Sequence, residues 1–279
     1  MIGSEGLKGK IRNIVNSKNL RSQEVLQMFF FERFLERLSK SKYKFNFVIK
    51  GGLLISSMIG IDNRTTMDMD TTIKGVPLKE EVIRNIISEI INVEVDDGIE
   101  FEITNISHIR EEDEYENFRV HLIANFDKIK NDIKIDITTG DAITPKEIEY
   151  LYPCMFQEES LRVLAYPLET ILAEKYESVI KRNISTTRMR DFYDLYNLYN
   201  LRKEEIDFDI LKQAIISTAN RRGSFSLMKQ AMEIIKDIKE DDYLKELWKV
   251  YLADNLYVGD LNFSETVKVV EIIAEKIAL

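Results

Sequence analysis

The stretch IKGGLLISSMIGIDNRTTMDMDTTIKG, residues 49–75, joins a glycine pair to an alternating pair of aspartates. Gly51 and Gly52 stand where a strand-like apolar run gives way to a helix-like run. Glycine permits close backbone approach, and the exposed amides at a helix start favour a phosphate. A tight turn that only packs the helix against a sheet would need the same two glycines. The stretch therefore predicts a strand, a turn, a helix and a second strand. The turn could bind a phosphate or only pack the helix against the sheet, and both roles stay open.

Asp68 and Asp70 are predicted to share one face of the second strand. Side chains alternate along a strand, so Met67, Met69 and Thr71 are expected to face the other way. The two carboxylates would then be neighbours in space. Acidic residues are also common on half-exposed strands, so the pair by itself does not decide for chemistry.

A second acidic strand is predicted at DIKIDI, residues 132–137. Asp132, Lys134 and Asp136 alternate there with three isoleucines and share the less buried face. If this strand lies beside the first, like-charge repulsion raises the pKa of at least one acid unless a cation intervenes. Mg²⁺ or Mn²⁺ would supply that cation, because both ions take carboxylate and phosphate oxygens, and such a site promotes phosphoryl displacement. The expected metal ligands are Asp68, Asp70 and Asp136.

The composition indicates a globular protein without a membrane segment or a disulfide. The 279 residues are 44% hydrophobic and 31% charged, and no apolar run approaches the roughly 20 residues of a membrane span. The N-terminus lacks the apolar stretch of a signal peptide, so we expect a cytoplasmic location and no membrane partner. A single cysteine, Cys154, excludes an internal disulfide, and two histidines leave no zinc-type cluster. Any metal must therefore be a hard cation held by carboxylates.

The formal net charge of −9 argues against broad affinity for nucleic acid. The distribution of charge matters more than its sum, because residues 181–222 contain a concentration of lysine and arginine. A basic face for an anionic partner and an ordinary solvated helical surface both remain open.

The hydrophobic period divides the chain into two halves. Residues 5–42 carry helical spacing, with Ser22 as an expected helix cap, and from Pro167 the pattern is helical to the end. Between them, strands are predicted at 45–49, 67–73, 100–106, 118–126 and 132–139, and helices at 52–60 and 78–92. We therefore predict an α+β fold in which a mixed sheet with flanking helices is followed by a C-terminal helical bundle. The predicted domains are 1–160 and 161–279.

Two charged residues stand on predicted buried faces of the helical half. After Pro167, which suits the first turn of a helix, apolar residues recur at spacings of three and four, with Lys175 among them. A buried ammonium is costly without an anion, so Lys175 either extends to the domain edge or meets the triphosphate of a nucleotide. Asp191 shares a predicted face with two leucines. An ion pair with Lys175 or Arg188 is the purely structural alternative for Asp191.

The order of these motifs resembles a known family, the AbiEii-type nucleotidyltransferase toxins of the polymerase-beta-like nucleotidyltransferase superfamily. The resemblance rests on Lys-Gly-Gly at 50–52, RTTMDMD at 64–70 and IKIDITTGDAITP at 133–145. YPLETILAEKYESVIKR at 166–182 and NISTTRMRDFYDLYNLY at 183–199 are similar to the family's third and fourth motifs, and IREEDEYENFRVHLIANF at 109–126 is also similar. Most of residues 45–200 is covered, and the implied fold is nucleotidyltransferase-like.

The resemblance implies an enzyme and its substrates. A toxin of this kind would transfer a nucleoside monophosphate from an NTP to an RNA acceptor, the tRNA 3′ end. It would be countered by a cognate antitoxin in phage defence through abortive infection, and direct contact between the two is left open. The implied catalytic residues are Asp68, Asp70, Asp136, Lys175 and Asp191. The implied nucleotide-binding residues are Lys50, Gly51, Gly52, Arg64, Thr66, Lys175, Arg188 and Arg190.

Two positions depart from the pattern of the relatives. Gly51 and Gly52 are followed by Leu53 where many nucleotidyltransferases have Gly-Ser, and Arg190 replaces a lysine, which keeps the charge but changes the donor geometry. Two other functions stay open: nucleotide transfer to a small molecule or a protein hydroxyl, and a non-catalytic nucleotide-binding module. Three clustered acids together with Lys175 favour catalysis, because a binding module has little need of them.

Overall fold

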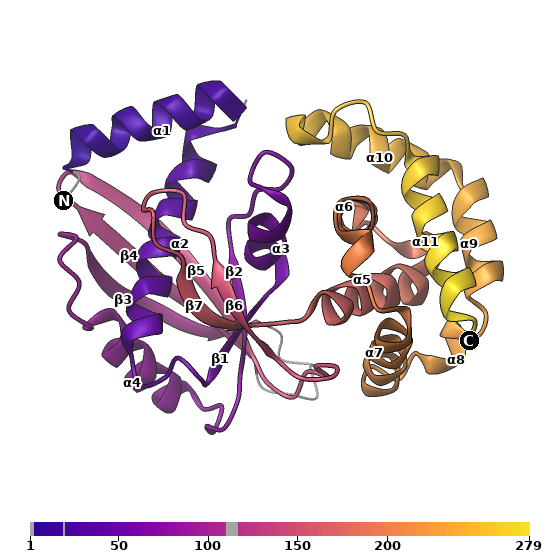
Figure 1. Ribbon diagram of the computed structural model, residues 1–279, viewed down its shortest axis with the longest axis horizontal. Coiled ribbons are helices and arrows are strands. Elements are labelled where there is room, and N and C mark those ends of the chain that lie inside the picture. Colours follow the sequence, from indigo (N-terminus) through magenta and orange to yellow (C-terminus); the bar gives the residue numbers. More distant parts are fainter. Residues whose placement is uncertain (1–2, 19, 110–116) are drawn as a thin grey trace. The chain divides into compact units, whose positions relative to one another are not determined.

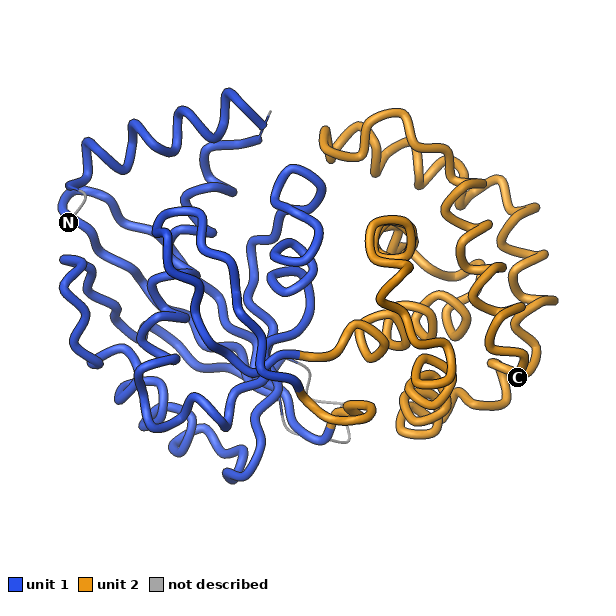
Figure 2. The backbone as a smooth tube through the Cα atoms, in the orientation of Figure 1, with its two compact units in different colours: residues 1–140, 148–165 blue, residues 141–147, 166–279 orange. Residues whose placement is uncertain are grey.

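The computed structural model describes residues 3–18, 20–109 and 117–279, and the chain forms two compact units (Figure 2). Unit 1 consists of residues 1–140 and 148–165, and unit 2 of residues 141–147 and 166–279. Residues 110–116, which form part of the motif IREEDEYENFRVHLIANF, lie outside the described residues.

The described part of unit 1 is built on a mixed seven-stranded sheet, which confirms the predicted fold class (Figure 1). The strands are β1 Phe47–Lys50, β2 Met69–Ile73, β3 Glu100–His108, β4 Phe118–Phe126, β5 Ile129–Thr138, β6 Ile148–Tyr152 and β7 Leu161–Ala165. Their order is β3-β4-β5-β2-β1-β7-β6. The pairs β1 with β7 and β2 with β5 are parallel, and the other neighbours are antiparallel.

The sequence pattern does not predict β6 and β7. Each contains five residues, and the periodicity of such a short apolar run does not separate a strand from a buried helix segment. Because β7 pairs with β1 inside the sheet, the division between the units falls after Ala165 rather than between residues 160 and 161.

Helix α2, Ser22–Lys40, covers one face of β5 and leaves the acidic face of that strand more open. The described helices are α1 Ser4–Lys18, α2 Ser22–Lys40, α3 Gly51–Ile59 and α4 Glu80–Ile91. Gln27 of α2 accepts a hydrogen bond from the Asn131 amide at 2.8 Å, so α2 packs on the face of β5 that carries Asn131 and the isoleucines. The three isoleucines are fully buried, whereas Asp132 and Lys134 are exposed. The predicted alternation of β5 is therefore confirmed.

The start of α2 differs from the prediction. Ser22 is the first helical residue, and Arg21 occupies the N-cap position. The backbone N–H of Arg21 donates to the Glu24 carboxylate at 3.1 Å, which satisfies an exposed donor at the helix start. The predicted Ser22 cap is wrong, because the helix begins at Ser22 itself and the cap position falls one residue earlier, at Arg21.

Unit 2 is helical from Leu168 to near the end of the chain, as predicted. Its α-helices are α5 Leu168–Arg182, α6 Met189–Arg202, α7 Phe208–Arg221, α8 Phe225–Met228, α9 Ala231–Glu240, α10 Asp242–Asp254 and α11 Phe263–Ile277. Short 3-10 turns are η1 Asn183–Ser185, η2 Lys203–Glu205 and η3 Leu256–Val258. The predicted apolar stripe of α5 is buried, including Leu172, Tyr176 and Ile180. None of the described helices combines the length and apolar composition needed to cross a membrane.

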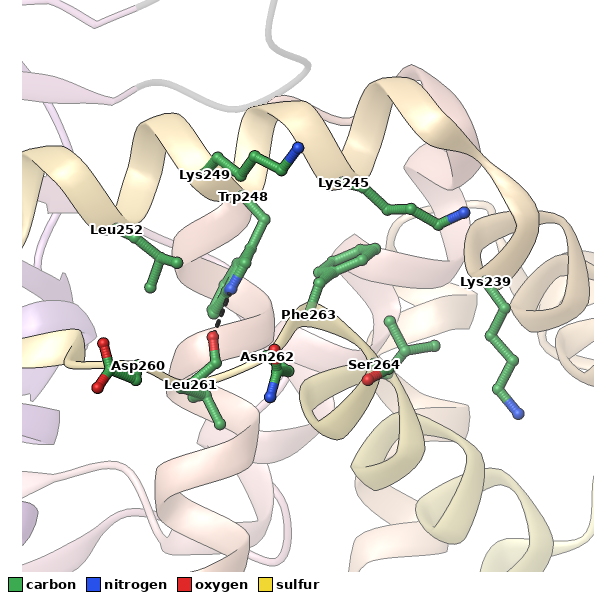
Figure 3. A pocket seen from close by; sticks show the side chains of 11 residues that line it. Lys239, Lys245, Trp248, Lys249, Leu252, Asp260, Leu261, Asn262, Phe263 and Ser264 are labelled. Carbon is green, nitrogen blue, oxygen red and sulfur yellow. Dashed lines mark hydrogen bonds between the residues drawn. The ribbon is translucent and has the colours of Figure 1, made fainter.

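A pocket of about 690 Å³ lies within unit 2 between parts of α9, α10 and α11 (Figure 3). The rings of Trp248 and Phe263 meet there with centroids 5.8 Å apart, and the Trp248 indole N–H donates to the Leu261 carbonyl at 2.8 Å. Both rings are buried, and the three lysines that line the pocket each pair with a neighbouring carboxylate. The pocket therefore has two buried rings at its base and exposed side chains, among them Lys249, Asp260 and Asn262, at its border.

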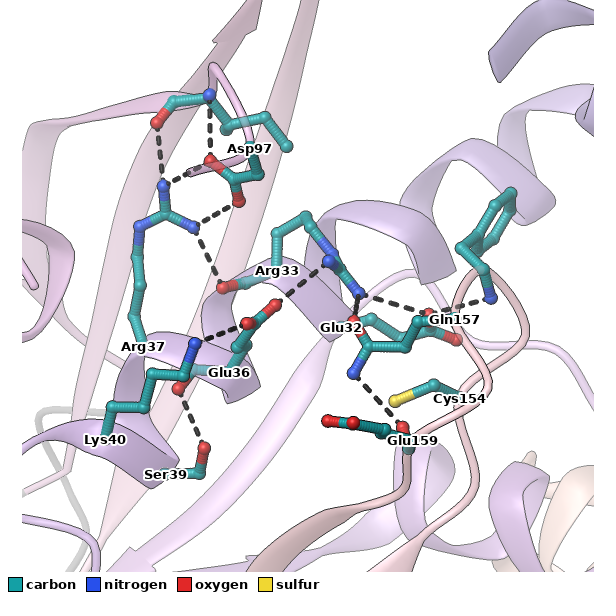
Figure 4. A network of polar contacts seen from close by, with 12 residues as sticks. Glu32, Arg33, Glu36, Arg37, Ser39, Lys40, Asp97, Cys154, Gln157 and Glu159 are labelled. Carbon is teal, nitrogen blue, oxygen red and sulfur yellow. Dashed lines mark hydrogen bonds and ion pairs between the residues drawn. The ribbon is translucent and has the colours of Figure 1, made fainter. Parts of the chain in front are cut away.

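A buried acid joins α2 to the segment between β6 and β7 (Figure 4). The Glu32 carboxylate accepts hydrogen bonds from the backbone N–H groups of Met155 at 2.7 Å and Phe156 at 3.2 Å. Arg33 lies 3.8 Å from this carboxylate and donates to Gln157 at 2.6 Å. Burial outweighs these contacts and raises the pKa of Glu32 from 4.5 to about 7.

Glu32 should make the protein less stable as pH rises. The pKa of Glu32 is higher in the folded than in the unfolded protein, so ionisation of this carboxyl costs folding free energy. This cost is absent below pH 4.5, grows with rising pH and is complete above about pH 7. The shift corresponds to about 3 kcal/mol. Urea unfolding at about pH 5 and about pH 8 should show a larger loss of stability in the wild type than in Glu32→Gln, which cannot ionise. An equal pH dependence in both proteins would contradict a buried ionisation at Glu32.

Candidate active site

Asp70 and Asp136 lie side by side near the centre of the sheet. β2 and β5 pair in parallel, and Asp70 is the register partner of Asp136. Partners on neighbouring strands point to the same face, so both acids project from the face opposite the buried isoleucines of β5. Both residues are half-buried. The structure therefore places Asp136, the predicted third acid, beside Asp70.

Asp68 precedes β2 instead of lying within it. The strand begins at Met69, and the Thr66 hydroxyl donates to the Asp68 carbonyl at 3.0 Å in the bend before it. A side chain that bonds the nearby backbone in this way competes with strand pairing. The predicted strand of residues 67–73 therefore begins two residues late, and Met67 is 42% exposed instead of facing the core.

Gly51 allows the turn after β1 to close onto Asp70. Its φ is +63°, and a Cβ atom at this position would lie 2.6 Å from Asp70 Cγ and closer still to Oδ2. A side chain could enter only if the turn or the acid moved. The backbone N–H of Gly52, at the start of α3, donates to the same carboxylate at 3.4 Å. The glycine pair and the acidic pair of the opening stretch are therefore in contact.

Gly52 permits a similarly close approach to the loop before the acids. A Cβ atom at Gly52 would meet the Thr66 hydroxyl at 2.7 Å and a guanidinium nitrogen of Arg64 at 3.0 Å. Arg64 is buried, its guanidinium donates to the Thr65 carbonyl, and its own carbonyl accepts from Ser56 of α3 at 2.6 Å. Arg64 and Thr66 are thus packed beside the glycine turn, and their contact with a nucleotide stays a prediction.

Lys50 brings a positive charge across the strand that carries Asp70. Lys50 ends β1 and is the antiparallel register partner of Asp70 in β2. Its ammonium donates to the Thr138 hydroxyl of β5 at 2.7 Å. Because β2 lies between β1 and β5, the Lys50 side chain spans the acidic strand.

Arg119 of β4 supplies a cation that the sequence patterns did not single out. It is the register partner of Asp136, and its guanidinium donates to both carboxylate oxygens at 2.7 and 2.8 Å. These bonds raise the pKa of Arg119 above its usual range; burial opposes the rise, and the charges of Asp136, Asp68 and Asp70 add to it. All three acids therefore act on one guanidinium.

The signal that could have revealed this contact is the hairpin between β4 and β5. Asp127, with a φ of +51°, begins its two-residue turn, so Phe126 pairs with Ile129. A fixed turn sets the register of the whole hairpin, which places Arg119 opposite Asp136.

The three acids are of the chemical kind that binds a hard divalent cation. One of them, Asp136, is bonded to Arg119. Asp70 and Asp136 offer adjacent carboxylate oxygens, which are the ligands that Mg²⁺ and Mn²⁺ favour. Across residues 3–18, 20–109 and 117–279, no group of three or more His, Cys, Asp or Glu side chains is already spaced to hold a metal ion. Asp136 presents both oxygens to the guanidinium instead.

In unit 2, Lys175 of α5 is held by two acids of α6. Its ammonium lies 2.7 Å from Asp191 and 2.9 Å from Asp194, and Ser178 donates to the second oxygen of Asp191 at 2.8 Å. Both acids are buried, so the anion that a buried lysine requires comes from within unit 2. The structural alternative for Asp191, an ion pair with Lys175, is present, and a role in catalysis stays a prediction. Asp194 was missed, although its spacing from Asp191 places both on one helix face.

Arg188 and Arg190 stand at the start of α6 with exposed side chains. Arg188 lies 3.9 Å from Asp191, and its side chain is 53% exposed, so this pair is weak. Both guanidinium groups remain accessible to an anionic ligand. Their contact with a nucleotide stays a prediction.

The mixed sheet, the paired acids and the glycine turn define the class of nucleotidyltransferase folds, and solved structures share this architecture. A candidate nucleotidyltransferase from H. pylori superposes with a TM-score of 0.56 at 17% identity, over 92% of this chain and 96% of that chain. JHP933 from Helicobacter pylori gives a TM-score of 0.56 at 17% identity, over 92% and 93% of the two chains. Likeness at this identity shows the fold. A search of curated proteins gives no match.

The chain belongs to the family of AbiEii nucleotidyltransferase toxins of type IV toxin–antitoxin systems, whose sequence profile matches residues 33–277. The predicted family is confirmed, and the match extends beyond residues 45–200 into the last helices. Membership indicates an enzyme with a nucleotide substrate that belongs with an antitoxin.

Replacement of Gly51 by alanine should destabilise the protein more than the same change at Gly223. The two glycines have φ values of +63° and +64°, but a Cβ atom at Gly223 would meet nothing within 4 Å. Gly223→Ala should therefore cost roughly 1–2 kcal/mol for the backbone alone. Gly51→Ala adds the clash with Asp70, so its loss of unfolding free energy in urea, followed by circular dichroism, should be clearly larger. Equal losses would show that the turn does not press on the acid.

Proposed function

We propose that this protein transfers a nucleoside monophosphate from an NTP to an RNA acceptor, the 3′ end of tRNA, and releases pyrophosphate. The supporting observation is the in-register pair of Asp70 and Asp136 with the glycine turn closed onto Asp70. In this reaction the acceptor hydroxyl oxygen bonds to the α-phosphorus of the NTP while the bond to the pyrophosphate oxygen breaks. The function fits the family and requires groups that bind phosphates, orient them and accept one proton.

The acids of unit 1 would hold the metal and handle the proton. Asp68, Asp70 and Asp136 are the proposed ligands of Mg²⁺ or Mn²⁺, which when bound neutralises the charge that develops on the phosphates. We assign acceptance of the acceptor hydroxyl's proton to the Asp136 carboxylate, which is half-buried on the more open face of the sheet. Asp70, fixed against the glycine turn, orients its oxygens without losing side-chain freedom during the reaction.

Positive groups would bind the nucleotide. Lys50 and the backbone amides of the glycine turn stand beside Asp70, and Arg64 and Thr66 pack against the same turn. In unit 2, Asp191 and Asp194 hold the ammonium of Lys175 in one position. We propose that Lys175 stabilises phosphate charge and that these acids position it, as the family resemblance implies.

The exposed arginines of α5 and α6 favour an RNA acceptor. Arg182, Arg188 and Arg190 are exposed, and such groups bind nucleic-acid phosphates by releasing counterions. Arg222 contributes less to such a face, because it bonds to Glu174 at 2.6 Å and Glu177 at 2.8 Å. An action as a toxin in phage defence by abortive infection, offset by the cognate antitoxin, completes the proposal.

Purified protein incubated with Mg²⁺ and each α-labelled NTP should place label on purified tRNA. Asp70→Asn keeps the shape of the side chain but removes its charge, so the rate of transfer should fall by roughly 10²–10³-fold. Asp132→Asn is the matched control, because Asp132 lies on the same face of β5 as Asp136 but is exposed. Its rate should stay near that of the wild type.

Three outcomes would contradict the proposal. Label that appears only on protein or on a small hydroxyl compound would replace the RNA acceptor. Absence of transfer with all four NTPs would indicate a binding module. Equal rates for the wild type and Asp70→Asn would remove the acidic pair from the chemistry.

A further inference from the structure

We propose that Arg119 masks the third acid of the site: it holds Asp136 in the metal-free protein and must release this carboxylate when a divalent cation binds. The inference rests on the proposed function in one respect, the assignment of Asp136 as a metal ligand. It adds a residue with a defined role in regulating that site.

The geometry of the ion pair makes the metal and Arg119 compete for the carboxylate of Asp136. The guanidinium donates Nε–H and Nη2–H to the two oxygens of Asp136 at 2.7 and 2.8 Å. A two-point contact of this kind is among the stronger polar interactions of a protein and fixes the plane of the carboxylate. A cation that approaches the oxygen lone pairs now facing the guanidinium displaces at least one of these bonds.

Charge acts in the same direction as geometry. Without a metal, Arg119 is attracted by Asp68 and Asp70 as well as by Asp136, so it reduces the repulsion among the three acids. A divalent cation among the same acids would repel the guanidinium. The acids can therefore be neutralised by Arg119 or by the metal, and each weakens the binding of the other.

The position of the pair allows exchange without unfolding. The side chains of Arg119 and Asp136 are 33% and 14% exposed, so solvent reaches the pair. Arg119 lies on β4 and Asp136 on β5, both held by an antiparallel register of nine residue pairs. Only the arginine side chain has to rotate, and the backbone of the sheet can stay in place.

The mask lowers the apparent affinity of the site for metal. A ligand that binds only the open state has its dissociation constant divided by the open fraction. If the ion pair is closed in about nine molecules out of ten, removal of Arg119 should tighten metal binding roughly tenfold. The third acid would then become available as the metal binds.

Calorimetric titration of the metal-free full chain with Mn²⁺ tests the inference without any measurement of transfer. Arg119→Met keeps the length of the side chain but removes its donors and its charge, and should lower the Kd roughly tenfold. Lys134→Met is the matched control, because Lys134 lies on the same face of β5 and its loss removes one charge without touching Asp136. Its Kd should change by less than about twofold.

A second variant and a second measurement protect the test from misfolding. Arg119→Lys keeps the charge but cannot form the two-point contact, so it should give a Kd between those of the wild type and Arg119→Met. In the unaltered protein, addition of Mg²⁺ should shift the nuclear magnetic resonance signal of the Arg119 Nε–H group, which loses its bond to Asp136.

The outcomes separate this inference from the proposed function. Weaker metal binding by Arg119→Met would mean that Arg119 orients Asp136 for the metal, and a change equal to that of Lys134→Met would mean a general charge effect; either result overturns the mask. Saturable Mn²⁺ binding with a Kd that substitution of Arg119 does not change would leave the proposed function standing and would contradict the proposed role of Arg119. Absence of saturable Mn²⁺ binding in every variant would overturn both.

Discussion

The parallel pairing of β2 with β5 sets the position of the site in unit 1. This register puts Asp70 beside Asp136, and Asp70 in turn determines what can stand at residue 51, because any Cβ atom there would occupy the place of its carboxylate. The glycine turn is therefore explained by the acid, whether or not its amides also bind a phosphate. Helix α3 begins at that turn, and the loop with Arg64 and Thr66 packs against its second glycine. A change of register by one residue would send the acids to opposite faces of the sheet.

Charge is balanced differently in the two units. In unit 1, acids gather on a partly solvated face and share the guanidinium of Arg119. In unit 2, one partly buried ammonium is held by two buried acids, Asp191 and Asp194, which fixes Lys175 closely. A paired buried charge is expensive to break, whereas solvent reaches the Arg119–Asp136 pair, whose side chains are 33% and 14% exposed. This contrast agrees with the two proposed roles, in which Lys175 stays fixed to bind phosphate and the carboxylate site exchanges Arg119 for a metal.

The sequence predicts the parts of this architecture that have a clear period. Strand alternation in β4 and β5, the buried stripe of α5 and the helical half follow from the spacing of apolar residues, and the family follows from motifs around the acids. The strands β6 and β7 were missed because their runs are too short to show a period. Asp68 lies outside β2 because the Thr66 hydroxyl bonds to its carbonyl in the bend before the strand begins. Arg119 was missed because its importance arises from strand register, and the turn at Asp127 that sets this register was not recognised.

Asp70 and Asp136 are proposed to form a carboxylate pair that binds a divalent cation where Arg119 now binds Asp136. Anomalous X-ray diffraction from crystals of the protein with Mn²⁺ and a non-hydrolysable NTP analogue tests this claim most directly. Manganese should lie in contact with both carboxylates, and the Arg119 side chain should have left Asp136. Manganese bound only elsewhere on the protein, or bound at this pair while Arg119 keeps both bonds to Asp136, would contradict this claim.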